Sequence, residues 1–365
     1  MSLEIRNPQS AIRNPLILGI ESSCDETAAA VVRGGREVLS NIIASQHDLH
    51  AKFGGVVPEI ASRGHIERIL PVIDEALAEA KPSLEQLDAI AVGNRPGLIG
   101  SLLVGVAAAK TLAWSLGKPL IAVDHVKAHL YAGALDGQPI EYPALGLVVS
   151  GGHTSLYVLH GPLEMEPLGR TIDDAIGEAY DKVAAILGLG FPGGPVVDKL
   201  AQQGDPEAVE LPRTLLEPDS LDFSYSGLKT AVLYEVRGRP VGRGAAARFE
   251  RDVSTLTDQR KADIAASFQV AAVDVVIEKL MRAMESLDGR GVRVKSLVIG
   301  GGVSANSSLR RRADLFGTMH DMDVRLPKMG YCLDNAAMIA GMAAELYKAG
   351  MFAGLDLEAK ATTDV

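Results

Sequence analysis

Two histidines spaced four residues apart are the side chains in this sequence best suited to holding a metal. His125 and His129 lie in "DHVKAHLYAG", directly after the short apolar run "LIAVD", which predicts a strand. On a helix, residues i and i+4 project from one face, so both imidazoles can reach a single ion. A pair of surface or capped histidines would have the same spacing, and this alternative stays open. His47 and His50, in the polar stretch "QHDLHAKFGG", are interpreted as structural residues of a loop.

Glycine-rich turns are the second feature with chemical potential. They occur in "VVSGGHT", "FPGGP" and "VIGGGVS", and a related small-residue turn lies in "GIESSCDETAAAVV". Glycine and serine let successive backbone N–H groups close around an anion. Any one of these turns alone is more typical of a structural role, but their recurrence at corresponding places in the chain favours phosphate binding.

The predicted strands and helices that must position these residues occur in the same order twice along the chain. Three β-like segments from Leu16 precede an amphipathic helix over 57–80, and then come a strand, a helix over 99–116 and a strand over 120–123. Near Ala144 three strands begin again, followed by helices, a long helix over 262–287, two strands and a last helix from about Leu333. The repeat predicts an α/β protein with two related lobes, each built on a βββαβα unit.

Composition fits a globular chain without an export or membrane signal. The 365 residues are 47% hydrophobic and 4% aromatic, and the two cysteines, Cys24 and Cys332, are expected to be buried small hydrophobes. The start "MSLEIRNPQSAIRNP" has no apolar core, and "GSLLVGVAAAKTLAW" is judged too short to span a bilayer, so we expect a cytoplasmic protein without membrane contact.

The net charge of −10 argues against binding a polyanion over the whole surface, but one stretch is basic. Between Lys229 and Lys261 the basic residues outnumber the acidic ones. They are Lys229, Arg237, Arg239, Arg243, Arg248, Arg251, Arg260 and Lys261. This stretch is a candidate tRNA or phosphate contact, and an exposed, mobile loop is the alternative.

Several motifs, in order, resemble a known family. They include "GIESSCDETAAAVV", "GGVVPEIASRGHIERILPVI", "HVKAHLYA", "LVVSGGHTSLY", "DDAIGEAYDKVA", "FSYSGLKTAV", "GGGVSANSSLR" and "YCLDNAAMIA". From Leu16 to about Gly350 the chain resembles the tRNA threonylcarbamoyladenosine transferases, formerly labelled O-sialoglycoprotein endopeptidases. The resemblance implies the two-lobed fold of actin, sugar kinases and heat-shock ATPases, with duplicated RNase H-like units and an interlobe cleft. The expected division is a flexible arm (1–15), lobe I (16–140, joined by a helix at about 330–365) and lobe II (141–329).

The resemblance also implies an activity and its residues. Such enzymes transfer an L-threonylcarbamoyl group from threonylcarbamoyl-adenylate to N6 of adenosine 37 in tRNAs that read ANN codons, and AMP leaves. The family's metal ligands, for iron or zinc, fall on His125, His129 and Asp334, a set that leaves coordination positions open for substrate. The adenylate contacts fall on Val148, Val149, Ser150, Gly151, Gly152, Asp181, Gly194, Asp198 and Asn306. Glu21 and Ser22 are further candidate contacts, and the same cleft is a candidate site for ATP, ADP or AMP.

Each assignment has a plainer alternative. Asp181 would otherwise be a solvated helix acid, as is expected of Asp173 and Asp174, and Asn306 would be an N-cap. One departure from the family pattern is Arg95 in "VGNRPG", where a small residue is expected.

The implied partners are tRNA, a smaller non-catalytic paralogue (TsaB-like) and an ATPase subunit (TsaE-like). The helix in "PEIASRGHIERILPVI" is a candidate paralogue surface, or packs on its own sheet. Three rival functions remain. They are an ATP-dependent kinase or ATPase of the same fold, a binding-only scaffold, and a metalloprotease, which lacks its usual base because Val126 follows His125.

Overall fold

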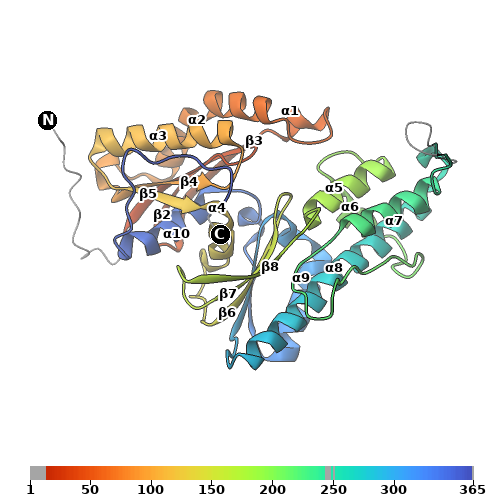
Figure 1. Cartoon of the computed structure of the whole chain (residues 1–365). Coiled ribbons are helices and arrows are strands. Elements are labelled where there is room, and N and C mark those ends of the chain that lie inside the picture. The colour runs from red at the N-terminus through yellow and green to blue at the C-terminus, as the bar shows by residue number, and fades with distance from the viewer. Residues whose placement is uncertain (1–13, 243–247, 250, 364–365) are drawn as a thin grey trace. The chain divides into compact units, whose positions relative to one another are not determined.

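The computed structural model describes residues 14–242, 248–249 and 251–363 (Figure 1). Most of the predicted arm, together with Arg243 and Glu250 of the basic stretch, lies outside the described residues. Two compact units divide the chain. Among the described residues, the first comprises 14–140, 161–164 and 325–363, and the second comprises 141–160 and 165–324.

The first unit is built on a five-stranded sheet. Its strands are β1 (Leu16–Glu21), β2 (Glu26–Arg33), β3 (Glu37–Ser45), β4 (Ala89–Arg95) and β5 (Leu120–Asp124). Their order is β3-β2-β1-β4-β5, with β1, β2 and β3 antiparallel and β1, β4 and β5 parallel. Every residue of β1 is buried, as expected of a strand covered on both faces.

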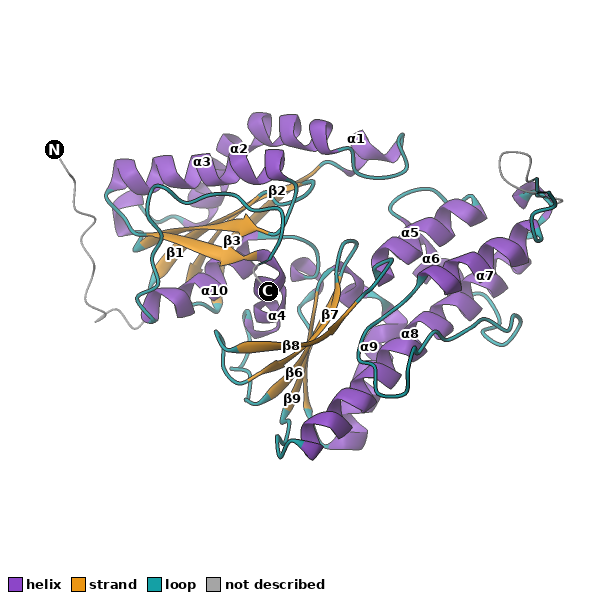
Figure 2. Cartoon of the chain, in the orientation of Figure 1, coloured by secondary structure: helices purple, strands orange, loops and turns teal. Residues whose placement is uncertain are grey.

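Helices cover both faces of this sheet (Figure 2). On one face α2 (Pro58–Ala80) and α3 (Ile99–Leu116) bury Ile69, Val72 and Val106 in the core with β1 and β4. On the other, α10 (Ala336–Lys348) packs against β1 and β2. Gly19 permits this approach, because a Cβ there would stand 2.5 Å from the carbonyl oxygen of Ala336.

The expectation that the apolar segment in α3 is too short to span a bilayer is wrong. The helix has 18 residues, and by length and composition it is long and apolar enough to cross a membrane. Its inner face, with Leu102 and Val106, is buried on the sheet, whereas Leu103 and Trp114 are exposed, and 33% of the span is buried.

The second unit repeats the strand order of the first. Its strands are β6 (Ala144–Val149), β7 (Thr154–Leu159), β8 (Met165–Arg170), β9 (Ser296–Gly300) and β10 (Asp323–Arg325), in the order β10-β9-β6-β7-β8. Again the first three strands are antiparallel and the fourth joins the first in parallel. The predicted duplication is therefore confirmed in the topology.

The helices described in the second unit are α5 (Ile176–Leu187), α6 (Gly193–Ala201), α7 (Ser226–Arg237), α8 (Asp258–Gly289) and α9 (Ser307–His320). Helix α8 begins four residues before the predicted start at 262, because Thr257 caps it by accepting from the N–H of Arg260. The basic stretch is consequently not one loop, since it begins in α7 and ends in α8.

Candidate metal centre

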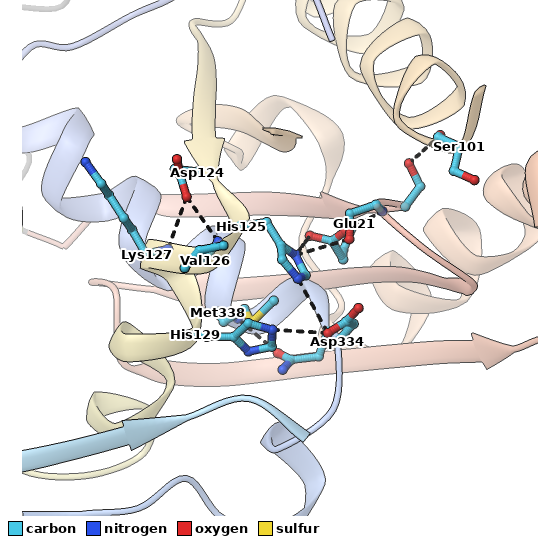
Figure 3. Close-up of polar contacts among 12 residues, drawn as sticks. Glu21, Ser101, Asp124, His125, Val126, Lys127, His129, Asp334 and Met338 are labelled. Carbon is cyan, nitrogen blue, oxygen red and sulfur yellow. Dashed lines mark hydrogen bonds and ion pairs between the residues drawn. The ribbon is translucent and has the colours of Figure 1, made fainter. Parts of the chain in front are cut away.

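Both histidines of the pair lie on one short helix. Helix α4 (His125–Tyr131) directly follows β5, and Asp124 caps it by accepting from the N–H groups of Val126 at 3.0 Å and Lys127 at 3.2 Å (Figure 3). The rings of His125 and His129 lie 4.6 Å apart between centroids and are nearly perpendicular, with 79° between their planes. Both side chains are buried.

Asp334 meets both rings from a distant part of the chain. It lies two residues before α10, and its Oδ1 stands 3.5 Å from His125 Nε2 and 3.1 Å from His129 Nε2. Ligands held tetrahedrally at about 2.1 Å from a metal lie about 3.4 Å from one another. The three atoms therefore have the spacing of a ligand set for one ion.

The buried nitrogens support the same interpretation. Nδ1 and Nε2 of His129 are buried and make no hydrogen bond, although the Asp334 carboxylate stands 3.1 Å from Nε2, and a buried nitrogen without a hydrogen bond is costly. An ion bound at Nε2 would satisfy that nitrogen, and two imidazoles with one carboxylate would leave positions open on the ion.

A second layer of contacts orients His125. Its Nδ1 lies 3.0 Å from Glu21 Oε2 and 3.2 Å from Ser23 Oγ, which directs Nε2 towards Asp334. The other oxygen of Glu21 accepts from the N–H of Ser23 at 2.5 Å. Carboxylate partners of this kind fix the ring orientation of metal-binding histidines.

Charge around the two rings differs. Burial by itself lowers the pKa of His125, but the charges of Glu21 and Asp334 outweigh it and raise that pKa to about 9. For His129 burial prevails, and its pKa falls below the usual value. Metal binding requires both Nε2 atoms to be unprotonated, so an ion would displace a proton held there by His125.

Glu21 and Ser22 are part of this unit's interior and do not form an exposed loop. Glu21 is fully buried against His125, and Ser22 Oγ donates to the carbonyl of Ser101 at 2.9 Å. Sequence reasoning missed the pairing of Glu21 with His125. The available signal was that β1 and β5 are parallel strands of one sheet, whose carboxyl ends meet at one edge.

A second group of potential ligands consists of Asp25, Glu26 and His47. His47 Nε2 lies 3.1 Å from Glu26 Oε1 and 3.9 Å from Asp25 Oδ2. Burial raises the pKa of Glu26 to about 8, and the hydrogen bond from His47 opposes this rise. The loop predicted here is wrong, because α1 (His47–Ala51) is a helical turn in which His50 is buried and accepts from the N–H of Val57.

The predicted adenylate residues all lie in the second unit. Val148 and Val149 are buried in β6, so only their backbone is available to a ligand. Gly151 and Gly152 form the β6–β7 turn with Ser150, and a Cβ on either glycine would meet nothing within 4 Å. The two glycines therefore border open space on the side where a Cβ would lie, and the N–H of Ser150 is used within the turn, donating to the carbonyl of His153 at 2.8 Å.

Three polar residues of that set are held by internal bonds. Asp181 accepts from the N–H of Gly193, next to Gly194, and Asp198 accepts from the N–H and hydroxyl of Ser307. The N-cap role of Asn306 is confirmed, since its Oδ1 accepts from the N–H groups of Ser308 and Leu309. Its Nδ2 donates to Gln269 Oε1 at 2.8 Å. The ligand roles of these residues stay predictions.

Asp173 and Asp174 are not the solvated helix acids that were expected. Asp173 accepts from the hydroxyls of Ser224 at 2.6 Å and Ser226 at 2.7 Å, and both serines belong to "FSYSGLKT". Asp174 pairs with Lys182 at 2.6 Å and Lys229 at 2.8 Å. These bonds lower the pKa of both carboxyls against the opposing effect of burial, and they tie the start of α5 to α7.

The cysteines behave differently from each other. Cys332 is buried as predicted, whereas Cys24 is only partly buried as a residue. Desolvation and the neighbouring Asp25 raise the pKa of the Cys24 thiol, so it is not an activated nucleophile.

The class of protein follows from the fold. Two five-stranded sheets of the same strand order, flanked by helices, define the fold that actin, sugar kinases and heat-shock ATPases share. Component A of (R)-2-hydroxyglutaryl-CoA dehydratase from Acidaminococcus fermentans is similar over 92% of this chain and 99% of its own, with TM-score 0.50 and 16% identity. Full-length HypF is similar over 95% of this chain and 47% of its own, with TM-score 0.57 and 15% identity.

Sequence comparison narrows the class to one family. The model of TsaD, tRNA N6-adenosine threonylcarbamoyltransferase, matches residues 37–341. A relative of that name from Symbiobacterium thermophilum is 54% identical, covering 94% of this chain and 95% of the relative. Another, from Rhodopirellula baltica, is 52% identical, with 94% and 95% covered. The chain belongs to the tRNA N6-adenosine threonylcarbamoyltransferase family.

Proposed function

We propose that this chain transfers the L-threonylcarbamoyl group of threonylcarbamoyl-adenylate to N6 of adenosine 37 in tRNAs that read ANN codons. The observation that carries the proposal is the group of His125, His129 and Asp334, placed at ligand spacing in a chain of this family. In the reaction a bond forms between N6 and the carbamoyl carbon. The bond from that carbon to the phosphate oxygen breaks, N6 loses a proton, and AMP leaves.

His125, His129 and Asp334 would hold one divalent metal, iron or zinc. When bound, the metal supplies a Lewis acid for the carbamoyl oxygen and an anchor for the threonyl group. Glu21 and Ser23 keep the His125 ring directed at the ligand position, and α4 sets the separation of the two imidazoles. Because both histidines are buried, water would be excluded from their side of a bound ion.

The adenylate would be bound by the second unit. The N–H groups of Gly151 and Gly152 in this turn suit a phosphate, as backbone nests generally do, whereas the N–H of Ser150 already donates to the carbonyl of His153 at 2.8 Å. Asp181, Gly194, Asp198 and Asn306 are assigned to the nucleoside by the family resemblance, as is the capacity for ATP, ADP or AMP.

The proposed partners are tRNA, a smaller non-catalytic paralogue (TsaB-like) and an ATPase subunit (TsaE-like), all in the cytoplasm. Helix α2 supports the paralogue assignment. One of its faces is buried on the sheet, while Ile66 and Leu70 are 66% and 69% exposed. Exposed apolar side chains in such a row are typical of an interface.

The proposal is tested by transferring radiolabelled threonine to unmodified tRNA, with the adenylate-forming enzyme and the partner proteins supplied. Wild type should label adenosine 37, whereas His125→Ala and Asp334→Ala should bind little metal and label almost nothing. His47→Ala is the matched control, because it removes a histidine from the second acidic group of the same unit and should retain metal and activity.

Two results would count against the proposal. A fully metallated wild type that leaves tRNA unlabelled yet turns over ATP would favour a kinase-like activity of the same fold. If His47→Ala lost the metal while His125→Ala retained it, the metal site would be assigned to the group of Asp25, Glu26 and His47.

A further inference from the structure

The ladder between β4 and β5 contains a bulge beside the metal centre. Gly93 pairs with Val123, but the next pair joins Arg95 to Asp124, so one extra residue of β4 is accommodated. That extra residue, Asn94, donates from Nδ2 to the carbonyl of Glu358 and accepts from the N–H of Lys360. Because of the bulge, Asn94 forms its hydrogen bonds with the C-terminal segment, and Arg95 lies opposite Asp124 in the ladder. Bulges commonly redirect a side chain near a functional site.

The two oxygens of Asp124 have separate tasks. Oδ1 accepts from the N–H groups of Val126 and Lys127 and so caps α4. Oδ2 is buried and makes no hydrogen bond, and Arg95 Nε stands 3.6 Å from it, at ion-pair distance. A buried carboxylate is costly without a compensating charge, and Arg95 supplies that charge.

Helix α4 needs this support because it has only seven residues. Isolated helices of that length are unstable in water, so their geometry depends on the cap and on tertiary contacts. Both imidazoles of the candidate centre are on α4, and His125 immediately follows Asp124. A shift of the cap would move both rings relative to Asp334.

We propose that Arg95 is a positioning residue for the metal centre: set opposite Asp124 by the bulge, it holds the carboxylate that caps α4. Through Asp124 it holds α4, and with it His125 and His129, in place relative to Asp334. The inference rests on the proposed metal site, and it gives a role to the one residue of "VGNRPG" that departs from the family pattern.

The test uses the full chain, freed of metal and titrated with Co²⁺, whose visible absorption reports coordination geometry. Arg95→Gln removes the charge, and Asp124→Asn keeps a capping oxygen while removing the charge on that side chain. Each variant is expected to bind Co²⁺ about 10-fold more weakly, the lower end of the effect of outer contacts on metal affinity, with an altered absorption band. Arg95→Lys should restore most of the affinity.

The double variant separates positioning from a general loss of stability. If Arg95 acts through Asp124, the double variant Arg95→Gln with Asp124→Asn should bind Co²⁺ about as tightly as Asp124→Asn alone. Asp252→Ala removes a capping aspartate from the second unit and should leave Co²⁺ binding unchanged. Unchanged affinity and spectrum in Arg95→Gln, or an undiminished further loss in the double variant, would overturn the inference. If the wild type bound no Co²⁺, the proposed metal site would itself be contradicted, and this inference would fail with it.

Discussion

At the scale of single residues, the buried histidines of the first unit differ in the groups that face their rings. His125 faces the carboxylates of Glu21 and Asp334, and these hold its pKa up. His65 faces neutral groups, since Nδ1 lies 2.8 Å from Thr27 Oγ1 and Nε2 lies 3.0 Å from the carbonyl of Cys24. Because a carbonyl can only accept, Nε2 of His65 carries the proton and Nδ1 accepts from the Thr27 hydroxyl. Burial lowers the pKa of His65.

This environment predicts a pH dependence of stability. With its folded pKa below the unfolded value of about 6.5, His65 contributes stability that is present above that value and is lost as the pH falls through the folded pKa. The free energy of unfolding should therefore fall between pH 7 and pH 5, and it should fall less steeply in His65→Gln. Urea unfolding at several pH values measures both slopes, and equal slopes would exclude His65 as a source of the dependence.

At the scale of elements, the contact of α10 with β1 links the core to the metal centre. A side chain at Gly19 would collide with the backbone of Ala336, the first residue of α10, and Asp334 lies two residues earlier. The position of α10 thus decides where the carboxylate meets the two imidazoles.

Gly19→Ala should for this reason act on both stability and metal binding. Overpacking of a core contact typically costs about 1–3 kcal/mol, and the displacement of α10 should also weaken metal affinity. Gly289→Ala is the control, because a Cβ there would meet nothing within 4 Å. Urea unfolding and metal titration of the two variants check this, and a Gly19→Ala protein as stable as wild type would contradict the close packing.

Helix α2 has apolar residues both on the side that packs on the sheet and on its exposed side. Ala61, Val72 and Ala76 are buried, whereas Ile66 and Leu70 are exposed. Replacing both exposed residues, Ile66→Asp with Leu70→Asp, should abolish association with the paralogue and leave the melting temperature nearly unchanged. Analytical ultracentrifugation of the mixture measures this, with Glu67→Lys on the same helix as control. Retained association would place the interface elsewhere.

At the scale of the whole molecule, the net charge opposes the binding of the proposed acidic substrate, tRNA. The net charge is −10, and part of the basic stretch is already neutralised, with Lys229 paired to Asp174 and Arg260 paired to Glu235. Arg239 and Arg248 are exposed members of the stretch. We therefore predict that these two arginines contact tRNA phosphates.

Reversing their charge should weaken tRNA binding. In Arg239→Glu with Arg248→Glu, the slope of log affinity against log salt concentration should become shallower by about 1 for each phosphate that the protein no longer neutralises. Arg293→Glu, another exposed arginine of the second unit, is the control. Filter binding at several salt concentrations measures the slopes, and equal slopes in all three proteins would remove this stretch from the tRNA surface.

Local sequence determined much of this protein. Alternation and turn residues predict the strands of both sheets, the repeat predicts the second sheet from the first, and the spacing of His125 and His129 predicts that they share a helix face. These features depend on neighbours within a few residues. They can therefore be predicted without knowing which distant residues they contact in the folded protein.

Only the tertiary structure decided how distant residues meet. Glu21 reaches His125 across 104 positions, and Asp334 completes the group because Gly19 lets α10 settle on β1. The bulge that sets Arg95 against Asp124, and the bonds of Asp173 to Ser224 and Ser226, likewise arise from strand register and packing. No local pattern encodes such contacts, because burial and long-range pairing choose among many side chains of suitable chemistry.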